Sequence, residues 1–151
     1  MEKLFCIQGN KPLKGEVKVS GSKNAALPIL ASTLISSGNN IIKNLPDISD
    51  VRHFLELLEY LGANISKNKE AVIINTDSVK IPDNFEINHY TIGKMRATVL
   101  LLAPILARFG EIKMNFPGGC VLGKRSFDAH LKFFENVGVE ILNDKNYLHL
   151  K

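Results

Sequence analysis

Two stretches of the chain resemble each other closely enough to restrict the fold to one unit used twice. They are LLEYLGANISKNKEAVIIN (57–75) and FFENVGVEILNDKNYLHLK (133–151), and an offset of 76 places Gly62 on Gly138. In each stretch we expect a helix that ends at the glycine, then a strand, a polar turn and a second strand. Glycine is favoured just past a helix end, and Asn and Asp are favoured in turns. Repetition at this length indicates a duplicated supersecondary unit.

The similarity extends upstream of these stretches. IKNLP (42–46) matches KMNFP (113–117) at an offset of 71. Two apolar segments with helical spacing precede them, at roughly 23–37 and 94–108. Matching the glycines that end these segments gives an offset of 72, and matching LPILA to APILA gives 76. The two helix registers differ by about one turn, so the helix faces agree in either case.

Each half is therefore predicted to run strand–helix–strand–helix–strand–strand. Repeat one spans about residues 15–78 and repeat two about residues 88–151. A length of 151 residues suits one domain with a sizeable core. The predicted fold class is α/β, with both repeats in a single domain.

Composition narrows the classes of function. A net charge of +4 is a mild excess of cations, which suits a small anionic substrate better than nucleic acid. The four histidines are scattered, so no metal site is expected, and no apolar run is long enough to span a membrane. Two cysteines make no disulfide framework. With no signal peptide recognisable, we expect a cytoplasmic protein without membrane partners.

The halves differ at the loop before their second helix. The second half carries FPGGCVLGKR (116–125), which is longer than its counterpart and is glycine-rich and cationic. The loop is read as a phosphate cradle, a reactive thiol or an ordinary turn. Gly118, Gly119 and Gly123 allow close backbone approach, and nearby cations stabilise a thiolate. Cys6, within the apolar run LFCI, is expected to be a buried hydrophobic residue.

The same loop satisfies the pattern G-x-x-x-x-G-K of a P-loop. A P-loop needs Ser or Thr directly after the lysine to hold Mg²⁺. This chain has Arg125 there, with Ser126 one position late. An NTPase is therefore a weaker alternative.

Two further segments favour anions. In VSGSKNAALP (19–28), Gly21 is expected to end a strand and Ser22 to cap the helix that follows, with Lys23 and Asn24 on its first turn. A cation at the positive end of a helix dipole is explained by an anion bound between them. The offset of 72 brings Arg96 to the equivalent end of the sister helix, so that Lys23 and Arg96 line one cleft. Solvated surface charges are the alternative interpretation for both residues.

The motifs SGSKNAALPIL, KMRAT, ARFG and FPGGCVLGKRSFDAH, in this order, resemble the UDP-N-acetylglucosamine enolpyruvyl transferases. The resemblance runs along the whole chain. The related shikimate enolpyruvyl transferases share the repeat but typically lack Asn24 and the cysteine loop. The resemblance implies an inside-out α/β barrel, of which two βαβαββ-type repeats are present here. It also implies bacterial peptidoglycan synthesis, phosphoenolpyruvate and UDP-N-acetylglucosamine as substrates, and no metal or organic cofactor.

Site roles follow from the resemblance by matched position. Cys120 is implied to be the general acid, the site of covalent addition and the target of fosfomycin. Lys23 and Asn24 are implied to bind phosphoenolpyruvate, and Lys23 and Arg125 to take part in catalysis. The residues implied to bind the sugar nucleotide are Arg96, Arg125, Ser126, Phe127, Asp128 and Ala129.

The chain departs from the family pattern in two ways. Ser126 stands where proline is common, and Ala129 replaces a larger apolar residue, which alters the expected uridine pocket. The 151 residues also contain two of six expected repeats. The resemblance therefore implies an N-terminal fragment with half of the active site, whose strand 3–8 belongs with a missing second domain. A non-catalytic module that binds UDP-sugar or another anion is the alternative function.

Overall fold

The computed structural model describes residues 4–81, 96–115, 128–142 and 147–151. The first repeat contains α1 (Lys23–Ser32), the 3-10 helix η1 (Thr33–Ile35), β1 (Asn39–Lys43), α2 (Ser49–Tyr60), β2 (Asn64–Lys67) and β3 (Ala71–Asn75). The second contains the 3-10 helix η3 (Arg96–Leu101), α3 (Leu102–Phe109), β4 (Ile112–Asn115), α4 (Asp128–Asn136) and β5 (Tyr147–Leu150). The α/β class is thus confirmed.

Both repeats build an antiparallel sheet with equivalent strand pairing. The first sheet has the strand order β1-β3-β2, and in the second β4 pairs with β5. Ile65 pairs with Ile74 in the first sheet, and an isolated bridge joins Ile141 to Leu150 in the second. The two pairs are related by the offset of 76 that the sequence predicts, so the duplication exists in the backbone pairing.

The two glycines predicted to end helices do so in the same way. Gly62 has φ 95° and Gly138 has φ 92°, a left-handed conformation that glycine adopts without strain. The N–H of Gly62 donates to Glu59 at 2.9 Å, and the N–H of Gly138 donates to Glu135 at 3.0 Å. In both repeats the next residue donates to a carbonyl five residues back. These bonds form a Schellman motif, which turns each helix into the following strand.

The register of the first strands corrects one expectation. Asn40 pairs with Ile74 and Ile112 pairs with Leu150, so β1 and β4 are related by 72 residues rather than 71. A shift of one residue would place every side chain of a strand on the opposite face. Burial therefore decides the register, because Met114 is fully buried at the position equivalent to partly buried Ile42.

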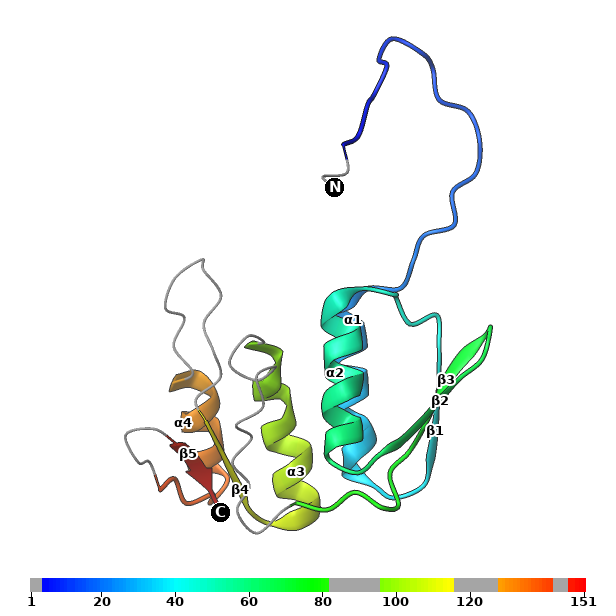
Figure 1. Cartoon of the computed structure of the whole chain (residues 1–151). Helices are drawn as coiled ribbons and strands as arrows, with labels where there is room; N and C mark the ends of the chain where they lie inside the picture. The colour runs from blue at the N-terminus through cyan, green and yellow to red at the C-terminus, as the bar shows by residue number, and fades with distance from the viewer. Residues whose placement is uncertain (1–3, 82–95, 116–127, 143–146) are drawn as a thin grey trace.

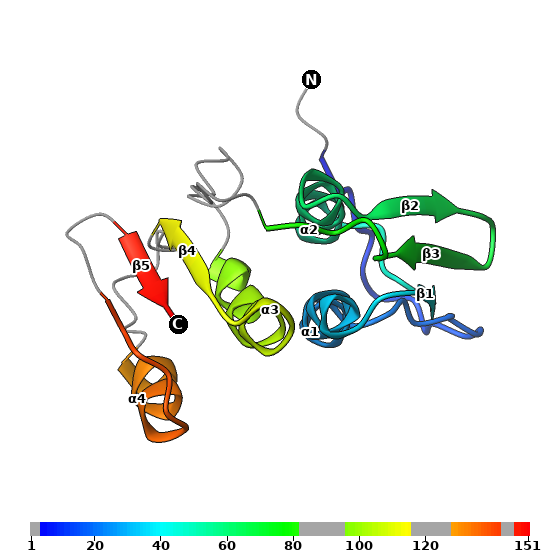
Figure 2. The ribbon, with the colours of Figure 1, turned by 90° about the horizontal axis from the view of Figure 1, so that it is seen from below.

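The core is formed where the helices meet the two sheets. Figure 2 shows α1, α2 and α3 side by side, with the three-stranded sheet next to α1 and α2 and the β4–β5 pair beside α3. Fully buried side chains come from both repeats, including Leu30, Phe54, Ile74, Leu101 and Ile105. Burial of this apolar surface supplies most of the stabilisation that fixes the helices.

The segment before α1 differs from the sequence expectation. Residues 4–20 form no helix or strand and extend away from the rest of the chain (Figure 1). The large apolar side chains of this segment are at least 81% exposed, and Cys6 is an exposed free thiol. The expected strand before Gly21 and the expected burial of Cys6 were therefore wrong for this structure. A strand needs a neighbour to pair its backbone groups, and the described residues supply none to this segment. The assignment of strand 3–8 to a second domain stays a prediction.

Candidate functional site

The predicted site residues that the structure describes lie at helix starts. Figure 1 shows that α1, α2, η3 with α3, and α4 all begin at the upper end of the molecule. This common direction follows from the repeat, because β1 runs back from the end of α1 toward the start of α2, and β4 runs back from the end of α3 toward α4. Helix starts carry unpaired N–H groups and partial positive charge. Gathered at one end, they favour an anionic ligand.

Lys23 is paired with a carboxylate of the neighbouring helix. It lies on the first turn of α1, and its Nζ donates to Oδ2 of Asp50 at 2.8 Å. The two side chains are 52% and 36% exposed. Lys23 is therefore an ion-paired and half-exposed residue, and its part in binding an anion stays a prediction. Sequence reasoning did not give Asp50 a role. An acidic residue in the first turn of a helix is nevertheless a recognisable feature of a helix start, and Asp50 has this position in α2.

The loops before the two helices come unusually close. A Cβ atom added to Gly21 would lie 2.0 Å from the carbonyl oxygen of Asn44 and 3.1 Å from Pro46. Glycine is thus required at position 21, and Asn44 itself has a left-handed φ of 55°. Ser22 occupies the N-cap position as predicted, but its side chain makes no capping bond. The close approach of the loops accounts for the meeting of Lys23 and Asp50.

A second acidic residue near the start of α2 has a different partner. Oδ1 of Asp47 accepts a hydrogen bond of 2.7 Å from Nε of Arg52. This bond, together with the charge of the guanidinium, holds the pKa of Asp47 below its ordinary value. Asp47 and Asp50 therefore belong to separate ion pairs on one loop and helix start.

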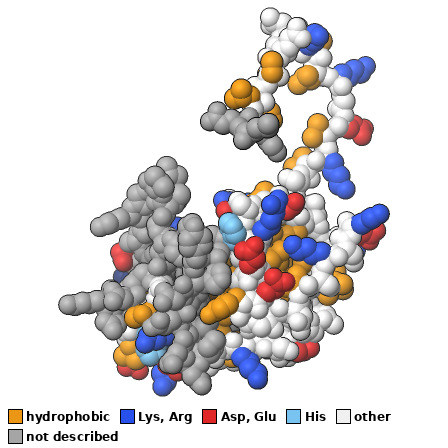
Figure 3. Space-filling view, in the orientation of Figure 1, with side chains coloured by type: hydrophobic (Ala, Val, Ile, Leu, Met, Phe, Trp, Pro, Cys, Tyr) orange, Lys and Arg blue, Asp and Glu red, His pale blue; other side chains and the backbone are white. Residues whose placement is uncertain are grey.

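Asn24 and Arg96 also lie at helix starts. Asn24 is exposed beside Lys23 on α1, and half-buried Arg96 begins η3, which packs against α1. Figure 3 shows basic and acidic side chains next to one another where α1 and α2 begin. The structure thus brings Lys23 and Arg96 to the same end of neighbouring helices, and a cleft lined by both stays a prediction.

Asp128 and Ala129 begin α4 and are both exposed. Ala129 lines an apolar groove of about 320 Å³ between α4 and the η3–α3 segment. The other lining residues are Val99, Leu100, Ala103, His130, Phe133 and Phe134. The predicted residues Cys120, Arg125, Ser126 and Phe127 lie outside the described residues, as does the glycine-rich loop.

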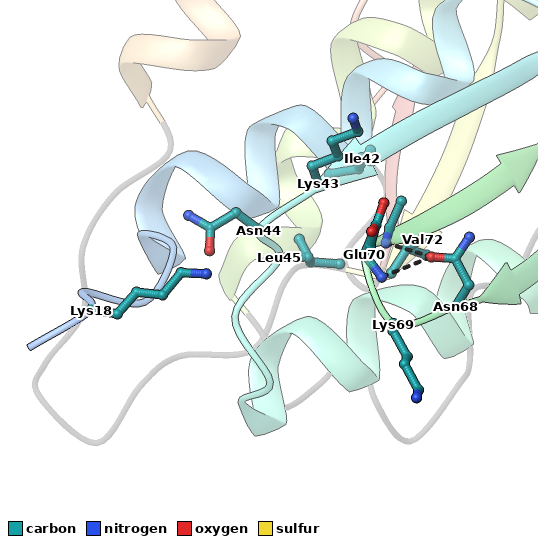
Figure 4. A pocket seen from close by; sticks show the side chains of 10 residues that line it. Lys18, Ile42, Lys43, Asn44, Leu45, Asn68, Lys69, Glu70 and Val72 are labelled. Atoms are coloured by element: carbon teal, nitrogen blue, oxygen red, sulfur yellow. Dashed lines mark hydrogen bonds between the residues drawn. The ribbon is translucent and has the colours of Figure 1, made fainter.

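A larger hollow lies at the edge of the first sheet where β1 ends and the β2–β3 turn stands. It measures about 630 Å³ and is lined by residues of β1, of the β2–β3 turn and of the segment before α1 (Figure 4). Oδ1 of Asn68 accepts hydrogen bonds from the backbone N–H groups of Glu70 and Ala71, which shapes the turn. None of the predicted site residues lines this hollow. It nevertheless borders the helix starts, because Asn44, whose carbonyl oxygen contacts Gly21, is one of its lining residues.

Among the described residues, no three His, Cys, Asp or Glu side chains are grouped as a metal site would require. Within the same ranges, no helix has the length and apolar character to cross a membrane.

Comparison with known proteins decides the family. The family described as EPSP synthase (3-phosphoshikimate 1-carboxyvinyltransferase) matches residues 7–151. The chain belongs to this family. The members of this family are enzymes, specifically transferases.

The similar curated relatives carry one name. The chain is 43% identical over 147 residues to the UDP-N-acetylglucosamine 1-carboxyvinyltransferase of Acinetobacter guillouiae, covering 97% of this chain and 34% of the relative. It is 43% identical over 151 residues to the protein of that name from Geotalea uraniireducens (strain Rf4), covering 100% and 35%. The chain thus spans about a third of the length of these relatives.

A solved structure shows the same fold. The enolpyruvyl transferase NikO from Streptomyces tendae superposes with a TM-score of 0.71 at 20% identity, over 92% of this chain and 30% of that one. At this identity the likeness concerns the fold alone. The fold of this chain is therefore that of an enolpyruvyl transferase.

Proposed function

We propose that the chain forms the N-terminal part of a UDP-N-acetylglucosamine enolpyruvyl transferase. The whole protein would transfer enolpyruvyl from phosphoenolpyruvate to the 3-hydroxyl of UDP-N-acetylglucosamine, with release of phosphate. The observation that carries this proposal is the similarity of the complete chain to relatives with this name. The order of the four motifs, with Cys120 in the glycine-rich loop, supports the sugar-nucleotide branch of the family.

The proposed reaction is an addition followed by an elimination. The 3-hydroxyl oxygen of the sugar bonds to C2 of phosphoenolpyruvate, and the Cys120 thiol donates its proton to C3. The tetrahedral adduct then loses a proton from C3 to the Cys120 thiolate while the C2–O bond to phosphate breaks, which restores the thiol. The hydroxyl proton goes to a carboxylate that the family resemblance places outside these 151 residues. Electrons and protons balance without a metal or organic cofactor.

The positions of the described residues are consistent with these roles. Lys23 and Asn24 at the start of α1 would meet phosphoenolpyruvate, whose charge the helix dipole favours. Lys23 would stabilise the charge that develops on the departing phosphate, with Arg125. Arg96 and the stretch from Arg125 to Ala129 would hold the sugar nucleotide. An inside-out barrel, a bacterial cytoplasmic location and a role in peptidoglycan synthesis belong to the same proposal.

Phosphate release tests the proposal. The assay compares the chain alone with a chimera in which it replaces the matching 34% of the Acinetobacter guillouiae relative. Both receive UDP-N-acetylglucosamine and phosphoenolpyruvate, and each has a Cys120→Ala control. We expect release by the chimera that disappears in the control. A folded chimera that releases no phosphate would contradict the proposal.

Calorimetry on the chain alone separates the alternatives. Binding of UDP-N-acetylglucosamine by the chain, with an inactive but folded chimera, would favour the non-catalytic binding module. Mg²⁺-dependent binding of ATP would instead favour the P-loop alternative.

A further inference from the structure

We propose that Asp50 is the positioning residue for Lys23, holding its ammonium where an anionic substrate meets the start of α1. The proposal rests on the proposed function only for the identity of that anion, phosphoenolpyruvate. The pairing itself is independent of any substrate, because it is a direct contact between two helices.

The ion pair joins two separate elements of the fold. Lys23 begins α1 and Asp50 lies in the first turn of α2, yet their charged atoms are 2.8 Å apart. A lysine side chain on a helix surface otherwise samples many rotamers around its flexible stem. The bond to Asp50 selects those rotamers that direct the ammonium along the helix-start end toward α2.

The pair contributes little as a stabilising contact. Both side chains are at least 36% exposed, and half-exposed ion pairs are screened by water and salt. Asp50 also has no need of Lys23 to balance its charge, since a carboxylate in the first turn of a helix is already favoured by the dipole. Lys23 is in the opposite situation, because its charge faces the positive end of its own helix. Asp50 offsets that repulsion and keeps the cation at this end.

The backbone on either side of the pair fixes the distance between the starts of α1 and α2. Gly21 touches the Asn44 carbonyl so closely that a Cβ atom could not enter, and Asn44 turns the chain with its left-handed φ. These contacts lie two residues before Lys23 and six residues before Asp50. The two helix starts are thus locked together by rigid backbone, which is what a positioning device requires.

Selective acylation of lysine amines tests the pairing directly. The chain is treated with limiting N-hydroxysuccinimidyl acetate, and mass spectrometry gives the rate at Lys23 relative to exposed Lys43 on β1. The neutral amine reacts, and a neighbouring carboxylate favours the charged form. We expect Asp50→Asn to raise the relative rate at Lys23 by about two- to fivefold, the size of effect that a half-exposed ion pair gives. Asp50→Glu should restore most of the protection.

Asp47→Asn is the matched control. It removes a carboxylate from the same loop, but one that pairs with Arg52 and not with Lys23. Its relative rate at Lys23 should equal that of the wild-type chain. Circular dichroism spectra establish whether each variant is folded. If Asp50→Asn does not fold, the folded Asp50→Glu variant still tests the pairing. An unchanged rate in the folded Asp50 variants, or an equal rise in Asp47→Asn, overturns the inference.

Protection by phosphoenolpyruvate separates this inference from the proposed function. Phosphoenolpyruvate should slow acylation of Lys23 in the wild-type chain, and Asp50→Asn should need on the order of tenfold more for the same protection. In a Lys23→Gln background, Asp50→Asn should leave the calorimetric affinity for phosphoenolpyruvate unchanged. If Asp50→Asn acted only by disturbing the structure, it would lower that affinity even without Lys23. A raised rate in Asp50→Asn without protection of the wild type would overturn the assigned role of Lys23 and leave the pairing intact.

Discussion

Arg108 on α3 donates a hydrogen bond of 3.0 Å from Nη2 to the carbonyl oxygen of Thr76, just after β3. Nη1 of the same guanidinium reaches the carbonyl oxygens of Leu34 at 3.4 Å and Ser36 at 3.3 Å. One side chain of the second repeat therefore joins three carbonyl groups of the first. The planar fork of arginine suits this arrangement, which lysine cannot reproduce.

Replacement of Arg108 should weaken the junction between the repeats. Arg108→Ala leaves the three carbonyls without this donor, so we expect the free energy of unfolding to fall by about 2–3 kcal/mol. Arg108→Lys should recover only part of the loss. Urea unfolding followed by circular dichroism measures both. An Arg108→Ala chain as stable as the wild type would show that the junction depends on apolar packing alone.

A matched pair on α1 tests the assignment of the core. Leu30 is fully buried, whereas the adjacent Ile29 is 48% exposed. Leu30→Ala should lower the free energy of unfolding by about 2–5 kcal/mol, because it removes buried methyl groups and leaves a cavity. Ile29→Ala should cost about 1 kcal/mol or less. Equal losses in urea unfolding would mean that α1 is placed with the wrong face inward.

Gly21→Ala should separate the two helix starts. The added methyl group would overlap the Asn44 carbonyl, so the loops must move apart, at an expected cost of about 1–3 kcal/mol in unfolding free energy. Acylation of Lys23 should rise at the same time, because the pair with Asp50 is stretched. Gly9→Ala is the control, since nothing lies within 4 Å of a Cβ atom there. A stable variant with normal Lys23 protection would contradict the close approach.

The contact between His149 and Glu111 at the second sheet should make stability depend on pH. Nε2 of His149 lies 2.6 Å from Oε1 of Glu111, and this bond holds the pKa of Glu111 below its ordinary value. A lowered pKa in the folded state adds stability above the unfolded pKa of about 4.3, and this is lost as pH falls through the folded value. The difference in Tm between wild type and Glu111→Gln should therefore be larger at pH 6 than at pH 3. A constant difference would exclude the linkage.

Cys120→Asp should preserve turnover in the chimera and abolish alkylation by fosfomycin. A carboxylic acid can still donate the proton to C3 of phosphoenolpyruvate, but it lacks the nucleophilic thiol. Phosphate release and intact mass spectrometry measure the two properties on the same sample. Alkylation that persists in Cys120→Asp would assign the reactive thiol to another position.

The sequence by itself determined the repeat and most of the helices and strands. Gly62 and Gly138 reveal the duplication because a left-handed helix end leaves few other choices of residue. The apolar spacing likewise predicts α1 and α3, since burial imposes the helical period on the residues that pack. Lys23 and Asn24 were correctly placed on the first turn of α1 from the local pattern alone.

Only the tertiary structure decided what these local features meet. The pairing of Lys23 with Asp50 joins helices whose approach depends on Gly21 and Asn44, and no periodicity in the sequence records that distance. The register of β1 and β4 was likewise settled by which side chains are buried. The sequence predicts strands at 3–8 and just before Gly21, yet a strand exists only where a neighbour pairs its backbone. Neighbouring residues determine the local helices and turns, whereas contacts between distant segments form only when these elements pack together.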